Sequence, residues 1–255
     1  MNGAGLLLRK ELLEQMRTLR LVMVVVVLAI FGGMSPLLAK LLPDIVKAAG
    51  AQAGGLSITM PPATTADAVA QLVKNLGQFG SLIAILVAMG AVATERERGT
   101  AGFVLTKPVG RSAFLAAKAA AIAVLLAAGV GAGYTFAWFY TAVLFEVLPL
   151  PGVIASAVAL WLSLLALAAM TFLCSVLARS ALVAGGAGFV ALIVTSIVSA
   201  FPIVGPYMPT ALWKPAVDLA LGTDPGSVVG PAVASVAFVA GCLGLAAAAF
   251  RRQEL

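Results

Sequence analysis

The chain has 255 residues, of which 62% are hydrophobic and 10% are charged, and its net charge is +6. A soluble domain is about half apolar and about a quarter charged, so this chain has too few polar residues to cover an apolar core in water. It also lacks histidine, the commonest metal ligand and the usual general base at neutral pH. We therefore expect a membrane protein, and histidine-dependent haem, zinc and serine-hydrolase chemistry is excluded.

The cysteines and the basic residues point to no metal site, disulfide or nucleic acid. Cys174 and Cys242 lie far apart in apolar runs without a CxxC spacing, which is typical of small buried side chains. The basic residues cluster beside apolar runs, so lipid head groups explain them better than nucleic acid does. Met1 to Leu8 lacks the charged start and cleavage site of a signal peptide, so we expect the first span to remain as an uncleaved anchor.

Leu6 to Arg20 precede the first long apolar run and have the pattern of an amphipathic helix. Apolar residues recur there at three- and four-residue steps, at Leu8, Leu12, Met16 and Leu19. The other faces hold Arg9, Lys10, Glu14 and Arg17. Such a helix is expected to lie in the membrane interface; a soluble helical extension is the alternative.

Six stretches are apolar and long enough to cross a bilayer core of about 30 Å, for which a helix needs about 20 residues. The third is longer than necessary, so part of it should project or tilt. Only two residues separate the fourth from the fifth, which predicts a tight helical hairpin. The spans are predicted at residues 21–42, 76–94, 113–145, 153–178, 181–204 and 228–250. The expected fold class is an all-α integral membrane protein with six transmembrane helices.

Lysine and arginine are unequally distributed between the two sides of these spans. With six spans both termini share one side, and that side carries every arginine and twelve of the sixteen basic residues. The other side carries only Lys40, Lys47, Lys74 and Lys214. Cytoplasmic segments are enriched in lysine and arginine, so both termini are predicted to be cytoplasmic.

Two segments on the outer side are long. Residues 43–75, with AQAGGLS and TMPPATT, are expected to be irregular, with room for one short helix. Residues 205–227 include Trp213 and Lys214, which suit a short helix at the outer interface. Glycines at positions 129, 131 and 133 and at 185, 186 and 188 lie inside spans and let helices approach closely. We expect them to serve packing within this chain rather than a dimer seam.

The deep portions of all six predicted spans hold no Asp, Glu, Lys or Arg, whereas the ion paths of secondary transporters depend on such residues. Lys118 lies near a span end and is expected to snorkel to the interface, and Glu146 lies at the outer end of the third span. Trp138, Tyr140 and Trp161 are expected to anchor or pack the spans. Energy for any transport is therefore expected from another protein.

The densest charged segment, residues 94–112, lies between the second and third spans. Alternating charges end the span, a glycine can end the helix, and a threonine can cap a short helix with an apolar face that a proline stops. Such a helix suits docking in a groove of a cytoplasmic partner; an ordinary charged loop that enforces topology is the alternative. The candidate docking residues are Glu95, Arg96, Glu97, Arg98, Gly99, Thr100, Phe103, Val104, Leu105, Pro108 and Arg111.

This segment, ERERGTAGFVLTKPVGRSAFLAAK (95–118), resembles the first cytoplasmic loop of ABC-2 type transporter permeases. Residues 9–20 are similar to the family's Lys-Glu entry and amphipathic elbow helix. The layout of the whole chain, 1–255, resembles one ABC-2 type transmembrane domain. The likeness is greatest to the branch that includes the permease of the nitrous oxide reductase maturation system and bacterial multidrug-type exporters.

The resemblance implies the permease of an ATP-driven exporter in a bacterial or archaeal cytoplasmic membrane. It implies a homodimer, with the first and fifth spans flanking the subunit interface, bound to two copies of a cytoplasmic ATPase. It also leaves room for an extracytoplasmic accessory protein. Gly99 to Val109 would be the coupling helix on the ATPase. The elbow helix beside it would present Arg9, Lys10, Glu11, Glu14 and Arg17.

The chain has no GxxxxGK[ST] phosphate loop, so ATP and Mg would be bound by the partner, no cofactor by this chain, and the chain is not expected to be an enzyme. A membrane anchor or scaffold for a cytoplasmic ATPase or maturation complex is the main alternative, which ATP-dependent substrate movement in vesicles would exclude. The uncharged spans disfavour a secondary transporter or channel. The lack of histidine and of an intramembrane carboxylate pair disfavours a membrane enzyme.

Overall fold

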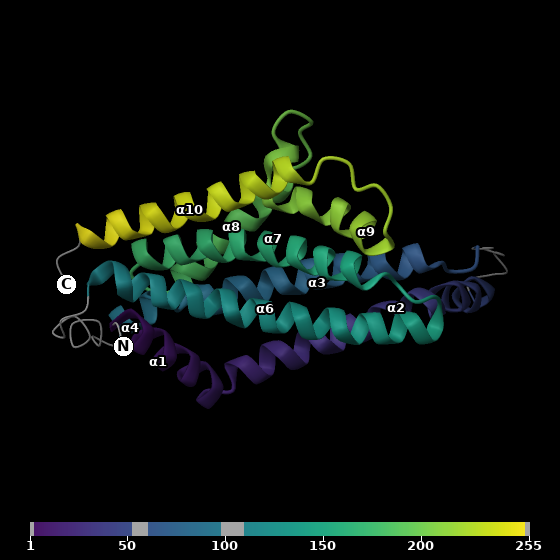
Figure 1. The fold of residues 1–255 in the computed structure, drawn as a ribbon, viewed down its shortest axis with the longest axis horizontal. Helices are drawn as coiled ribbons and strands as arrows, with labels where there is room; N and C mark the ends of the chain where they lie inside the picture. The colour runs from purple at the N-terminus through teal and green to yellow at the C-terminus, as the bar shows by residue number, and fades with distance from the viewer. Residues whose placement is uncertain (1–2, 53–60, 98–109, 253–255) are drawn as a thin grey trace.

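The computed structural model describes residues 3–52, 61–97 and 110–252, which fold into a bundle of helices (Figure 1). The described elements are α1 (Gly3–Arg17), α2 (Arg20–Gln52), α3 (Thr65–Met89), α4 (Ala93–Glu97), α6 (Arg111–Leu144), α7 (Leu150–Leu177), α8 (Ala181–Val198), the short 3-10 helices η1 (Gly205–Tyr207) and η2 (Pro209–Leu212), α9 (Trp213–Leu221) and α10 (Val229–Arg251).

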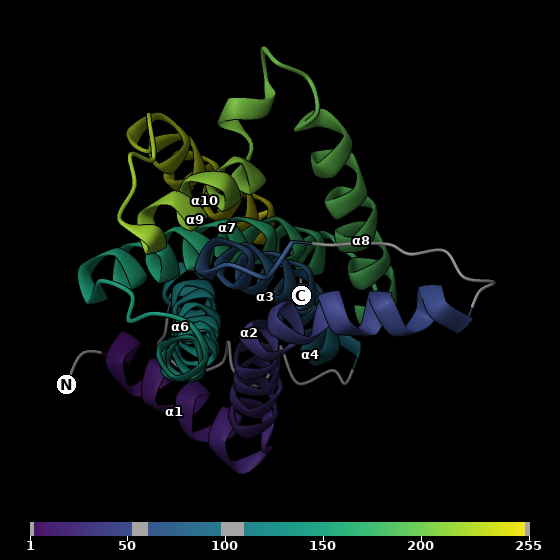
Figure 2. The ribbon, with the colours of Figure 1, turned by 90° about the vertical axis from the view of Figure 1, so that its right-hand side faces the viewer.

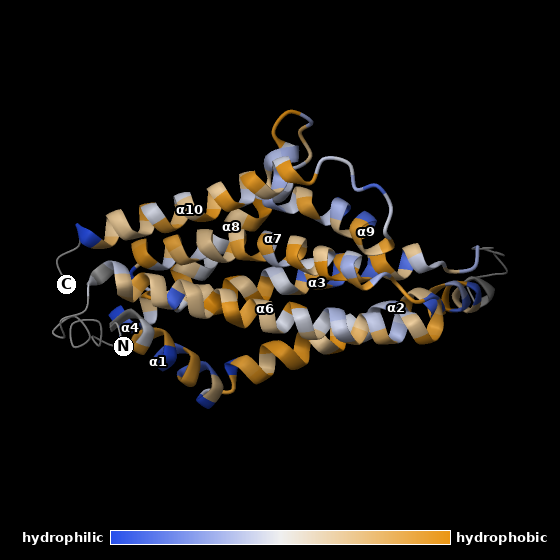
Figure 3. Ribbon diagram, viewed as in Figure 1, coloured by the Kyte–Doolittle hydropathy of each residue, from blue (hydrophilic) through white to orange (hydrophobic). Residues whose placement is uncertain are grey.

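Six helical segments in the described ranges are long and apolar enough to cross a membrane: α2, α3 with α4, α6, α7, α8 and α10. The predicted all-α class with six spanning helices is therefore confirmed. Apolar residues dominate the middle of the bundle, and hydrophilic residues gather towards its ends (Figure 3). The helices α1 and α4 and the end of α10 lie at one end of the bundle, which we call the inner end (Figure 1).

The outer segment 43–75 is more helical than expected, because α2 continues to Gln52 and α3 already begins at Thr65. A capping box starts α3: the Asp67 N–H donates to Thr64 Oγ1 at 3.3 Å, and the Thr64 N–H donates to the Asp67 carboxylate at 2.8 Å. At 33 residues α2 is about 50 Å long, well beyond the bilayer core. Hydropathy did not indicate these polar helical extensions.

The outer half of the bundle is completed by a chain segment that turns back into it. α8 ends at Val198 instead of the predicted Val204, because Pro202 and Pro206 cannot continue a helix. α9 then packs against α7 and α3, and the Trp213 indole N–H donates to Ser163 Oγ at 3.0 Å. Since Ser163 lies midway along α7, Trp213 sits inside the bundle and not at the outer interface where we expected it.

Glycines set the close approach of α2 to α6, which lie side by side (Figure 2). A Cβ on Gly32 would collide with the backbone of Gly133, and one on Gly129 would lie 2.7 Å from Leu28 Cδ1. Gly131, on the same helix as Gly129 and Gly133, faces open space. Two of the three glycines in the 129–133 pattern thus pack within the chain as predicted, while Gly131 does not.

We expect Gly32→Ala to destabilise the protein by about 1–3 kcal/mol, because the added methyl group must separate two packed backbones. The measurement is thermal unfolding of the purified protein in detergent micelles or nanodiscs. Gly131→Ala is the matched control, since its methyl group meets nothing within 4 Å. Equal unfolding temperatures for the two variants would contradict the proposed α2–α6 contact.

Candidate functional site

The inner end of the second span is interrupted, and a serine from another helix fills the interruption. α3 ends at Met89, and α4 begins at Ala93. The backbone N–H groups of Val92 and Ala93 donate to Ser175 Oγ at 3.1 and 3.0 Å, and the Ser175 hydroxyl donates to the Met89 carbonyl at 2.7 Å. Buried backbone groups that lack partners are costly in a membrane. The Ser175 hydroxyl therefore lets the break exist inside the bundle.

The three consecutive charged residues of α4 each bind a different helix. Glu95 pairs with Lys118 of α6 at 2.7 Å. Arg96 donates to the carbonyls of Val176 and Ala178, at 3.2 and 3.0 Å, at the end of α7. The Glu97 carboxylate accepts from the Ala181 N–H at 3.2 Å, at the start of α8. A cation at a helix C-terminus and an anion at a helix N-terminus are both favourable placements, so α4 is tied to three spans at once.

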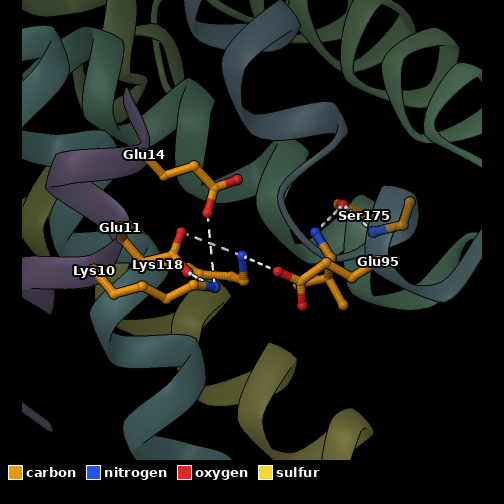
Figure 4. A network of polar contacts seen from close by, with 8 residues as sticks. Lys10, Glu11, Glu14, Glu95, Lys118 and Ser175 are labelled. Carbon is orange, nitrogen blue, oxygen red and sulfur yellow. Dashed lines mark hydrogen bonds and ion pairs between the residues drawn. The ribbon is translucent and has the colours of Figure 1, made fainter. Parts of the chain in front are cut away.

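Lys118 is the centre of an ion-pair network that joins α1, α4 and α6 (Figure 4). Its side chain is only 7% exposed, and its ammonium lies 3.3 Å from Glu11 and 2.7 Å from Glu95. The same ammonium lies 5.1 Å from the centre of the Phe114 ring, a cation–π distance. The expectation that Lys118 snorkels to the interface is therefore wrong: its charge is neutralised inside the protein.

The network continues along the elbow helix α1. Lys10 lies 3.5 Å from Glu11 and 3.6 Å from Glu14, and its side chain is half exposed. Partial burial lowers the pKa of Lys10, but the carboxylates of Glu11, Glu14 and Glu95 outweigh this effect and raise the pKa above its ordinary value. Three of the five predicted elbow residues, Lys10, Glu11 and Glu14, are thus in the network. The other two, Arg9 and Arg17, are exposed and belong to none of the ion pairs found among the described residues.

The predicted docking residues divide into two groups. Glu95, Arg96 and Glu97 lie in α4 and bind neighbouring helices of this chain. Arg98, Gly99, Thr100, Phe103, Val104, Leu105 and Pro108 lie outside the described residues, and Arg111 is the first residue of α6. Sequence reasoning missed Ser175 and the structural role of Lys118. A serine within an otherwise apolar run, one turn from a span end, was the available signal for Ser175.

An apolar cavity of about 660 Å³ lies between α6 and α7, well away from this network. Two tryptophans line it: Trp138 donates to the Leu148 carbonyl at 3.2 Å, and Trp161 donates to the Ala123 carbonyl at 3.0 Å. Both indoles therefore serve packing, as expected from the sequence.

Within residues 3–52, 61–97 and 110–252, no group of three His, Cys, Asp or Glu side chains is arranged to hold a metal ion.

The sequence matches one protein family over nearly its whole length. The family is described as ABC-2 family transporter protein, and the match covers residues 6–255. One similar protein is the uncharacterized transmembrane protein YxlG of Bacillus subtilis (strain 168), with 26% identity over 140 residues. That alignment covers 55% of this chain and 54% of YxlG, so the chain spans about half the length of this curated relative.

Replacing Lys118 with methionine should destabilise the protein by about 3–5 kcal/mol, because two carboxylates then lose their buried counter-ion. Lys10→Met is the matched control: Lys10 also contacts Glu11, but it is half exposed, and an exposed pair contributes about 0–1 kcal/mol. Thermal unfolding of both variants in nanodiscs compares them. A Lys118→Met variant as stable as Lys10→Met would show that the buried pair is not structural.

Ser175→Ala should destabilise the inner end of the bundle by about 1–3 kcal/mol, since it leaves backbone groups at the α3–α4 break without a partner. Hydrogen exchange followed by mass spectrometry should show faster exchange at residues 92–93. Ser196→Ala is the control, because that exposed hydroxyl bonds only to the Leu192 carbonyl of its own helix. Unchanged exchange at 92–93 in Ser175→Ala would mean that the break is held by other contacts.

Proposed function

Since this chain belongs to the ABC-2 family of transporter proteins, we propose that it is the permease subunit of an ATP-driven exporter whose ATPase is a separate polypeptide. One observation carries the proposal: the three charged residues of α4 bind α6, α7 and α8, and through Lys118 they also reach α1. A docking segment that follows α4 directly in the sequence would move α1, α6, α7 and α8 together. This is what a protein needs if it converts motion of a partner into motion of its spans.

The mechanism proposed is mechanical. ATP and Mg bind to the partner ATPase, and its closure displaces the segment from Gly99 to Val109, which would be the coupling helix. Because Glu97 of α4 accepts a hydrogen bond from the Ala181 N–H at the start of α8, displacement of this segment would pull on the start of α8. Arg96 would transmit the same displacement to the end of α7. The partner does work on the permease only if the two states of the spans make different contacts with it.

A homodimer that binds two ATPases completes the proposal, with the inner end of each chain in the cytoplasm. Of the six candidate spans in the described ranges, α8 has the smallest share of buried residues. Leu182, Val183 and Val190 on this helix are all more than half exposed. An apolar surface of this extent is compatible with a second copy of the chain on α8, and α2 would lie on the same interface. The cargo would then pass between the two copies.

Phe103→Asp and Gly99→Pro are expected to abolish binding of the ATPase or coupled ATP hydrolysis, because the first would charge the apolar face of the proposed coupling helix and the second would restrict the backbone at its start. Membrane insertion should remain normal. The complex is purified from native membranes through a tag on this chain, and ATP hydrolysis is measured. Thr223→Asp is the control, since it adds the same charge to an exposed turn beyond α9. Normal ATPase recovery and hydrolysis in both docking variants would refute the proposal.

The distance between two spin labels, one on each copy of the chain, distinguishes a transporter from a scaffold. Leu182→Cys, with both native cysteines replaced by serine, places one label on the 83% exposed Leu182 position of each copy. In the complex, ATP and Mg should change the distance between the two labels. A bound, active ATPase with an unchanged distance would favour a non-transporting anchor.

A further inference from the structure

A polar cavity of about 260 Å³ lies beneath the elbow helix, between α1 and the inner ends of α3 and α6. Three cations and three carboxylates line it, so the ionisable wall is balanced in charge. These residues are Lys10, Arg20, Lys118, Glu11, Glu14 and Glu95.

Five of these six charged groups already pair with one another, whereas Arg20 belongs to none of the ion pairs or side-chain hydrogen bonds found in the described ranges. Arg20 is also the first residue of α2, where the positive end of the helix adds to the attraction for an anion. A second lining residue, Gln15, has a buried Oε1 atom without a donor in the described parts of the chain. The exposed Arg20 guanidinium is thus open to an anion that approaches from the bilayer, and the buried Gln15 Oε1 can accept a hydrogen bond from a bound group.

An apolar groove of about 270 Å³ continues from this cavity between α2 and α3. Arg20 and Val87 line both hollows. The groove leads away along Met23, Val27, Ile83 and Leu86, and its exposed surface is almost wholly apolar. Since α2 and α3 are spanning helices, this groove extends from the interface towards the hydrocarbon core. Together the two hollows have the polar and apolar parts that a membrane lipid has.

We propose that the two hollows form one binding site for a phospholipid whose head group carries a primary amine, as in phosphatidylethanolamine. The phosphate binds the Arg20 guanidinium, the ammonium donates to Gln15 Oε1, and an acyl chain lies in the α2–α3 groove. A zwitterionic head group fits a wall of balanced charge. The site does not depend on the transport function proposed above, because it needs only the folded chain and the bilayer.

The amine is the specific part of the proposal. A quaternary choline ammonium has no N–H and cannot satisfy Gln15 Oε1, which would leave that buried acceptor unpaired. A head group such as glycerol phosphate supplies the anion for Arg20 but carries a net negative charge, which a wall of three cations and three carboxylates does not offset. We therefore expect phosphatidylethanolamine to bind more tightly than phosphatidylcholine or phosphatidylglycerol.

The test is native mass spectrometry of the full-length purified chain in detergent, titrated separately with phosphatidylethanolamine, phosphatidylcholine, phosphatidylglycerol and soluble glycerophosphoethanolamine. The first lipid should bind with the highest affinity, and the soluble head group should bind weakly because it lacks the chain that fills the groove. Arg20→Gln should weaken binding of phosphatidylethanolamine about tenfold, as expected for one charge-assisted contact. Gln15→Leu should remove the preference for ethanolamine over choline.

Arg17→Gln is the matched control, because Arg17 is an exposed arginine near the same elbow but lines neither hollow. Thermal unfolding verifies that each variant is folded. Equal binding of the ethanolamine and choline lipids would overturn the proposal. So would an equal loss in Arg17→Gln and Arg20→Gln, or a preference for phosphatidylglycerol, because either result indicates only general attraction of anionic lipid to a basic surface.

Discussion

A lysine ammonium removed from water needs carboxylates and hydrogen bonds in place of its hydration shell, and Lys118 meets this need by joining segments that are distant in sequence. Glu11 comes from the elbow helix and Glu95 from the end of the second span. If either carboxylate moved away, the buried Lys118 ammonium would lose one of its two ion pairs. The position of the elbow helix against the bundle is therefore linked to the position of α4, although the two helices belong to different parts of the chain.

The same constraint acts on the backbone around α4. A break in a spanning helix exposes N–H and C=O groups, and two neighbouring helix ends add further unpaired groups. Ser175 satisfies the break, Arg96 satisfies carbonyls at the end of α7, and Glu97 satisfies an N–H at the start of α8. With Glu95 paired to Lys118, each of the three charged residues of α4 thus has a different partner. Their first role in the described structure is to hold the inner end together, and any docking role would be added to that.

Hydropathy predicted the six spans well because each is an apolar run bounded by charge or proline, and the amphipathic pattern placed a helix before the first span. It failed where the deciding contact is distant in sequence. Glu11 and Lys118 are 107 residues apart, so nothing near Lys118 indicates that its charge is paired rather than solvated. Trp213 looked like an interfacial anchor because Lys214 and Pro215 follow it, yet its partner is Ser163, 50 residues away. The resemblance pointed to the segment around α4, but not to the residues of α7 that bind it.

α7 connects the two ends of the molecule. Its inner end accepts hydrogen bonds from α4, its middle accepts one from Trp213, and near its outer end Gly152 lies against the Leu219 carbonyl of α9. It also packs against α3, α8 and α10. Movement of α4 at the inner end must therefore either carry α7 with it or break the hydrogen bonds that Ser175, Val176 and Ala178 accept. α9, which turns back into the outer half of the bundle along α7, is then the element whose position would report motion that starts at α4.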